Sequence, residues 1–124
     1  MNKFPKTERL ASKKNIKELF SRGSSFHLYP FKVLYLPHPQ PQENTPLVQI
    51  LFTVPKRNHK KAVDRNKIKR RLKEAYRLHK NIIFTEKAPT VPYILGYVYL
   101  SKDIMSYKEL ESKLKSSLAR LEFT

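Results

Sequence analysis

Apolar residues at helical spacing predict three helices. The first spans 12–22, with Ser12 as its N-cap, Ile16, Leu19 and Phe20 on one face, and Gly23 in the left-handed conformation just after its end. The second runs from 64 to about 81, because apolar positions recur at i, i+4, i+7, i+8 and i+11 along it: Ile68, Leu72, Ala75, Tyr76 and His79.

The third predicted helix begins with a capping box, in which Ser106 and Glu109 satisfy each other's free N–H groups. Its apolar face is a stripe of four leucines: Leu110, Leu114, Leu118 and Leu121. This pattern indicates a helix that packs on one side only.

Segments rich in β-branched and aromatic residues predict the strands. Residues 31–36 alternate in a way that suits a strand with one more fully buried face, and a brief strand over 25–28 can precede it. Residues 47–54 are almost all apolar, as expected of a strand buried on both faces or in the middle of a sheet. Residues 91–100 form the last strand, in which Pro92 argues for an edge position or a late start.

The order of these elements predicts an α+β fold with helices packed on a small mixed sheet. Residues 37–46 hold four prolines in ten residues and therefore form a loop between strands. No linker or repeat divides the chain, so we expect one domain over 1–124, with a basic and loosely held segment 1–11.

The composition excludes several classes of protein to which the chain could belong. The chain has no cysteine, which excludes disulfides and thiol chemistry, and no apolar run long enough to span a membrane. Its start has no apolar signal core, so we expect a cytoplasmic protein.

The formal charge of +16 is concentrated between residues 56 and 80, where twelve Lys and Arg stand against two acids. On the predicted helix the side opposite the apolar face is basic and polar: Asn66, Lys69, Arg70, Lys73 and Arg77. The preceding loop delivers Lys56, Arg57, Lys60 and Lys61 beside the helix start. Only Arg70 and Glu74 have the spacing of an ion pair on this face, so an ordinary solvated surface is the weaker explanation.

Such a surface fits a polyanion. Nucleic acid suits it better than a membrane, because a membrane-surface helix would carry large apolar residues where this one has Ala75 and His79. The mixture of guanidinium, amide and ammonium groups at Arg65, Asn66 and Lys67 suits RNA phosphates and 2′-hydroxyls, which fixes position more than it reads sequence.

The sequence contains no arrangement of residues typical of a catalytic site. The four histidines have no metal-binding spacing, the two glycines cannot form a phosphate cradle, and the few carboxylates have simpler capping roles. We therefore expect neither a catalytic residue nor a metal in the protein. The aromatics, Tyr29 and Tyr35 among them, are either core residues or a platform for unpaired bases, and the sequence leaves both possibilities open.

The stretch Val54 to Arg77, VPKRNHKKAVDRNKIKRRLKEAYR, resembles the signature of the bacterial ribonuclease P protein subunit: a strand end, a basic loop, Ala-Val, and an Arg-Asn-Arg core followed by Lys-Arg. The resemblance extends to Arg9-Leu10, Leu19-Phe20 before Gly23, the Phe31 strand and the helix start at Ser106. It implies an α-β-β-β-α-β-α fold with a left-handed crossover at the central helix.

The resemblance also implies a function. Proteins of this family bind a catalytic RNA and precursor tRNA, and the complex is an endonuclease that removes the 5′ leader by phosphodiester hydrolysis. The RNA partner carries the active site and its Mg²⁺, so the implied role of the protein is binding. No membrane or DNA partner is expected.

By the same resemblance, Arg65, Asn66, Lys67, Lys69 and Arg70 match the motif that contacts the catalytic RNA, and we add Lys73 and Arg77 from the same helix face. Phe20 and Tyr35 match aromatics of a cleft for the single-stranded leader, with Lys56 and Arg57 at its end, and Lys60 and Lys61 belong to the basic loop.

Three positions depart from the family pattern. Lys67 replaces the second Arg of the motif and loses its bidentate fork, Ile16 replaces a frequent cleft aromatic, and the loop 58–61 is one residue longer and lacks its Gly. The alternative function is a ribosomal or other structured-RNA-binding protein without a processing role. A basic helix that binds duplex DNA is a third hypothesis.

Overall fold

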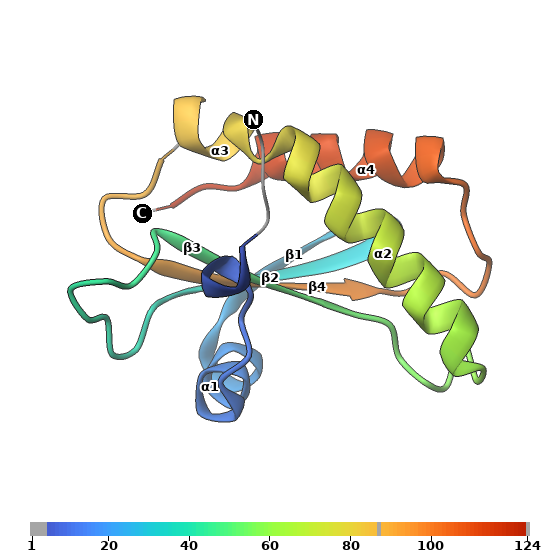
Figure 1. Cartoon of the computed structure of the whole chain (residues 1–124), viewed down its shortest axis with the longest axis horizontal. Coiled ribbons are helices and arrows are strands. Elements are labelled where there is room, and N and C mark those ends of the chain that lie inside the picture. The colour runs from blue at the N-terminus through green and yellow to red at the C-terminus, as the bar shows by residue number, and fades with distance from the viewer. Residues whose placement is uncertain (1–4, 87, 124) are drawn as a thin grey trace.

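The computed structural model describes residues 5–86 and 88–123 and confirms the α+β class (Figure 1). After a short 3-10 helix η1 (Lys6–Glu8), the chain forms α1 (Lys13–Arg22), β1 (Ser24–Leu28), β2 (Phe31–Pro37) and β3 (Val48–Thr53). It continues through α2 (Ala62–His79), α3 (Asn81–Glu86), β4 (Tyr93–Tyr99) and α4 (Tyr107–Arg120). The short helix α3 was not predicted; the expected end of α2 near residue 81 falls at its start.

The four strands form one mixed sheet in the order β1-β2-β4-β3. The pairs β1-β2 and β2-β4 are antiparallel, whereas β3 and β4 are parallel and are joined through α2 and α3. Figure 1 shows α2, α3 and α4 above the sheet and α1 below it. The sheet therefore has one face covered by three helices and an opposite face on which the shorter α1 packs.

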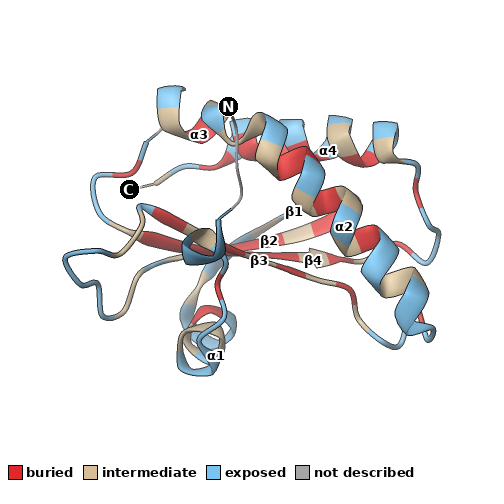
Figure 2. Cartoon of the chain, in the orientation of Figure 1, coloured by how far each residue is buried: buried red, intermediate tan, exposed pale blue. Residues whose placement is uncertain are grey.

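Two apolar cores follow from this layering (Figure 2). The main core lies between the sheet and the pair α2 and α4, with Phe31, Ile50, Tyr97, Leu72 and Leu114 among its buried members. The second core lies under α1, where Leu10, Leu19, Leu34 and Ile94 meet. Alternate residues of each strand point to opposite faces, so each strand contributes to both cores.

The two serines predicted as N-caps are confirmed. Ser12 accepts a hydrogen bond from the N–H of Asn15, and Ser106 accepts one from the N–H of Glu109. The Ser106 hydroxyl also donates to Glu109 Oε1 at 3.2 Å, which ties the two cap side chains together. The four leucines predicted for this helix are all fully buried, three of them within α4 and Leu121 as its C-cap.

The prediction of a left-handed Gly23 was wrong, because its φ of −68° and ψ of 148° are extended. The chain enters β1 at the next residue, which requires extended backbone. Glycine is needed for space instead: a Cβ there would lie 2.4 Å from the carbonyl oxygen of Leu19.

The strand positions also differ from expectation. β3 is an edge strand with alternating burial, whereas the sequence suggested burial on both faces or a central place. β4 is central, although Pro92 suggested an edge; only its late start, at Tyr93, was predicted correctly. The half-buried residues of β3 face the α1 side, which one short helix covers only in part.

The described part of the segment 1–11 packs against the sheet and α2 rather than lying free. Leu10 is buried, and its N–H donates to the carbonyl of Ile50 at 2.9 Å. Glu8 forms an ion pair with Lys80 at 2.9 Å. Residues 1–4 lie outside the described residues.

Candidate nucleic-acid interface

Helix α2 presents its basic face because its apolar stripe is held against the sheet and α4. Ile68, Leu72, Ala75 and Tyr76 are fully buried, as predicted. His79 is half-buried, and its Nε2 lies 2.9 Å from Oε2 of Glu111 on α4. The Tyr107 hydroxyl donates to the same carboxylate oxygen at 3.2 Å. These contacts fix the rotation of α2, so its other side faces outward.

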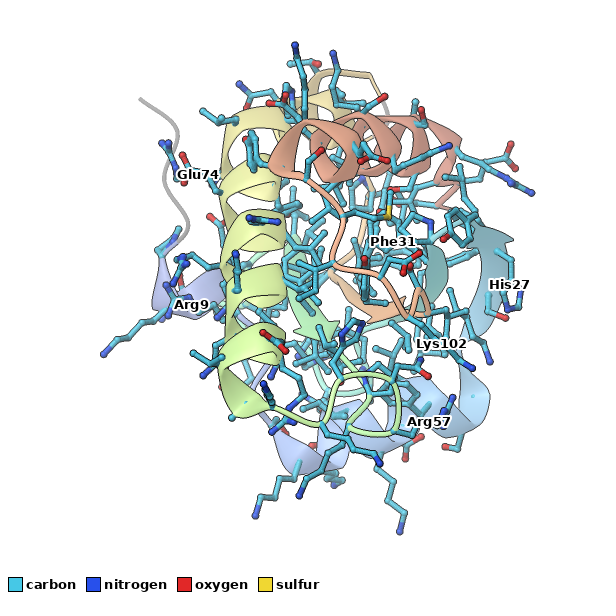
Figure 3. The ribbon with its side chains drawn as sticks, turned by 90° about the vertical axis from the view of Figure 1, so that its right-hand side faces the viewer. Arg9, His27, Phe31, Arg57, Glu74 and Lys102 are labelled. Carbon is cyan, nitrogen blue, oxygen red and sulfur yellow. The ribbon has the colours of Figure 1, made fainter. Side chains whose placement is uncertain are left out.

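A hollow of about 790 Å³ runs along this outward side. It brings together five of the seven residues predicted for RNA contact: Asn66, Lys69, Arg70, Lys73 and Arg77. Four further residues complete its lining: Arg9, Arg71, Glu74 and Tyr107. Figure 3 shows Arg9 and Glu74 on this side of α2. Six cations thus face one hollow with a single carboxylate among them.

Repulsion between these cations shows at Lys73. Partial burial lowers the pKa of Lys73, and the nearby charges of Arg9 and Lys69 lower it further. Neighbouring positive charges repel one another, and a bound anion relieves this repulsion. The hollow is therefore suited to the phosphates of a polyanion.

The single acid of the hollow has a different partner from the predicted one. Glu74 accepts hydrogen bonds from Nη2 and Nε of Arg77, at 2.6 and 3.0 Å, rather than pairing with Arg70. These bonds lower the pKa of Glu74 and raise that of Arg77. Arg70 is exposed and makes no ion pair with any described residue, so its charge is available to a bound anion.

Arg65 and Lys67 do not line the hollow. Nη1 of Arg65 donates to the carbonyls of His59 and Lys60, at 2.9 and 2.8 Å, and so ties the basic loop to the first turn of α2. Lys67 is exposed outside the hollow. The loop cations Lys56, Arg57, Lys60 and Lys61 are all exposed.

The two predicted cleft aromatics are not brought together. Tyr35 packs toward the main core, with its ring 6.4 Å from that of Phe26, whereas Phe20 lies on α1 beyond the other face of the sheet and is 46% exposed. Strand alternation explains the difference, because Leu34 and Leu36 occupy the face toward α1. Phe20 and Tyr35 therefore do not line one cleft.

Three lining residues were missed from sequence. Arg9 reaches the hollow because the neighbouring Leu10 is anchored on β3, and Tyr107 reaches it from the first turn of α4. Arg71 donates to the carbonyl of Met105 at 2.7 Å and braces the loop before α4. No periodic signal links the segments of Arg9 and Tyr107 to α2; the pair Arg9-Leu10, a cation beside a lone apolar residue, was the one usable hint.

No group of three or more His, Asp or Glu side chains is placed to hold a metal ion in the part of the chain described. None of the helices among those residues is long and apolar enough to cross a bilayer.

The fold and the hollow define a small, strongly basic α+β protein whose α2 presents a cationic face. The model of the Ribonuclease P family matches residues 4–122. The chain therefore belongs to the ribonuclease P protein family.

Relatives in sequence and in structure are consistent with this family. The chain is 28% identical over 117 residues to the ribonuclease P protein component of Porphyromonas gingivalis, covering 94% of this chain and 84% of that protein. It is 30% identical over 118 residues to that of Citrifermentans bemidjiense, covering 95% and 91%. The RNase P protein from Thermotoga maritima has a similar fold, with a TM-score of 0.71 at 22% identity over 93% of this chain and 98% of that one.

Proposed function

We propose that this chain is the protein subunit of a ribonuclease P holoenzyme and binds the catalytic RNA through the outward face of α2. The hollow carries the proposal: Asn66, Lys69, Arg70 and Lys73 converge there with Arg9 against one acid that Arg77 already engages. Arginine forks and lysine ammoniums hold phosphates with little dependence on sequence, so the helix would fix the position and orientation of a folded RNA.

The proposed contribution to the reaction is electrostatic positioning. Neutralising phosphates of the catalytic RNA and of precursor tRNA lets two polyanions approach each other, which lowers the concentration of divalent cation that the complex needs. We assign hydrolysis of the phosphodiester to the RNA partner and its Mg²⁺, as membership of the ribonuclease P protein family suggests. The result is removal of the 5′ leader to give the mature tRNA end.

For the leader itself we propose the half-covered face of the sheet beside α1. Phe20 exposes its ring there for stacking, and Lys56 and Arg57 follow the end of β3 as phosphate contacts. Tyr35 is left out, because its ring faces the main core.

Multiple-turnover cleavage of a precursor tRNA tests the proposal, using the ribonuclease P RNA of the same organism at low Mg²⁺ with and without the protein. We expect the protein to restore cleavage at the mature 5′ end and to show none alone. An Arg70→Gln, Lys73→Gln variant should lose this stimulation, whereas Lys113→Gln on the exposed side of α4 serves as the matched control.

If the wild-type protein binds RNA yet leaves cleavage by its own RNA unchanged, the holoenzyme role is refuted. A structured-RNA-binding protein without a processing role is then the better description. Affinity that does not rise when the precursor carries its leader would refute the leader contact alone.

A further inference from the structure

Three loops meet at the end of the sheet where β3 and β4 finish. The turn between β1 and β2 is held by a hydrogen bond from the N–H of Leu100 to the carbonyl of Pro30, at 2.7 Å. The basic loop is held by Nε2 of buried His59, which lies 2.8 Å from the carbonyl of Ser101. Asn58 Nδ2 reaches the carbonyl of Leu100 at 3.5 Å. These contacts place the three loops around Ser101.

Tyr29, in the turn, stands out at this junction. It is 63% exposed, whereas the tyrosines of β4 are buried. Its hydroxyl nevertheless donates to Ser101 Oγ at 3.2 Å, and that oxygen also accepts the N–H of Asp103 at 3.1 Å. Ser101 is only 3% exposed, so the tip of the ring is anchored to a buried group. The ring is therefore both open to solvent and held in orientation.

Two exposed cations lie in the loops that meet at this junction. Lys102 follows Ser101 directly, and Arg57 precedes Asn58; both side chains are exposed at this end of the molecule (Figure 3). Neither forms an ion pair with any residue that the structure describes. Asp103 is the one acid in the loop 100–106. An anchored aromatic beside uncompensated cations matches what an unpaired nucleotide requires: a flat surface for its base and positive charge for its phosphates.

We infer that Tyr29 is a stacking platform for an unpaired RNA base, with Lys102 and Arg57 beside its phosphates. The inference rests on the proposed RNA-binding function but concerns a surface separate from the hollow on α2, which none of these three residues lines. Duplex RNA does not fit, since its bases are already stacked. The nucleotide belongs either to the leader of the precursor or to an unpaired segment of the catalytic RNA.

The test compares Tyr29→Leu with Tyr29→Phe in the reconstituted holoenzyme. Leucine removes the aromatic face, and we expect binding to weaken roughly 5- to 150-fold, the range for losing one stacked base. Phenylalanine keeps the ring and should stay within about twofold of wild type, since the stacking surface remains. Both variants lose the hydrogen bond from the hydroxyl to Ser101, so their thermal unfolding should be the same and a difference in RNA binding reports the ring.

Two arms identify the source of the base. If Tyr29→Leu loses affinity only for precursor tRNA that carries its leader, the stacked base belongs to the leader. If it loses affinity for the catalytic RNA alone, the base belongs to that RNA. Lys102→Gln should lower the slope of log affinity against log salt by about 0.7, the value for one single-strand phosphate. Wild-type affinity of Tyr29→Leu in both arms overturns the inference, provided that the wild-type protein stimulates cleavage; if it does not, the proposed function fails first.

Discussion

Arg65 and Arg70 both belong to the motif of α2, yet their structural settings predict different responses to replacement by alanine. Nη1 of Arg65 bonds two loop carbonyls, and the N-cap residue Lys61 provides no side-chain cap, so Arg65 holds the loop to the helix. Arg70 is exposed in the hollow and has no ion pair with a described residue. Arg65→Ala should therefore reduce stability and RNA affinity together, whereas Arg70→Ala should reduce affinity alone.

The size of the stability effect follows from the two hydrogen bonds. At about 0.5–1.5 kcal/mol net for each bond, and with discounting for partial exposure, their loss should cost roughly 1–2 kcal/mol. For a chain of 124 residues this corresponds to a fall of roughly 4–8 °C in the unfolding temperature. In RNA binding, each lost phosphate contact should lower the salt slope by about 0.7–0.9.

Calorimetry and binding isotherms at several salt concentrations separate the two effects. Arg65→Lys is the matched control, because it keeps the positive charge but loses the planar fork. Compared with Arg65→Ala, it should restore most of the salt slope but less of the stability. Equal unfolding temperatures for Arg65→Ala and wild type would refute the loop-bracing role. An unchanged salt slope for Arg70→Ala would remove that residue from the RNA interface.

Three further predictions concern packing, capping and pH. Gly96→Ala places a Cβ 2.9 Å from Cδ2 of Leu19, and the resulting overpacking under α1 should cost about 1–3 kcal/mol in urea unfolding; an unchanged midpoint would contradict it. Ser106→Ala removes the cap of α4 and should cost about 0.5–2 kcal/mol, with Ser112→Ala on the exposed face as the control. The hydrogen bond from His79 lowers the pKa of Glu111. The ionised Glu111 should therefore stabilise the fold above its ordinary pKa of 4.5, and this stabilisation should be lost as pH falls through the lowered pKa. The Glu111→Gln variant should therefore be less stable than wild type at neutral pH, and this difference in the free energy of unfolding should shrink in acid. A difference that does not change with pH would contradict the prediction.

Local patterns in the chain were sufficient for α1, α2 and α4 and for the basic face of α2, but not for the short helix α3. Helical spacing depends only on neighbouring residues, which is why Ile68, Leu72 and the α4 leucines proved to be buried as predicted. The same periodicity placed Lys69, Arg70 and Lys73 on one side of α2, where the structure finds the hollow.

The sequence by itself therefore determined the fold class, the helices α1, α2 and α4, and the charged face. The pattern of each of these helices depends on residues only a few positions apart. Only the tertiary structure decided that β3 lies at an edge, that Tyr35 and Phe20 are separated by the sheet, and that Arg9 joins the hollow. Strand order, strand facing and the meeting of distant segments depend on which surfaces pack together across the whole chain, and no local pattern records that choice.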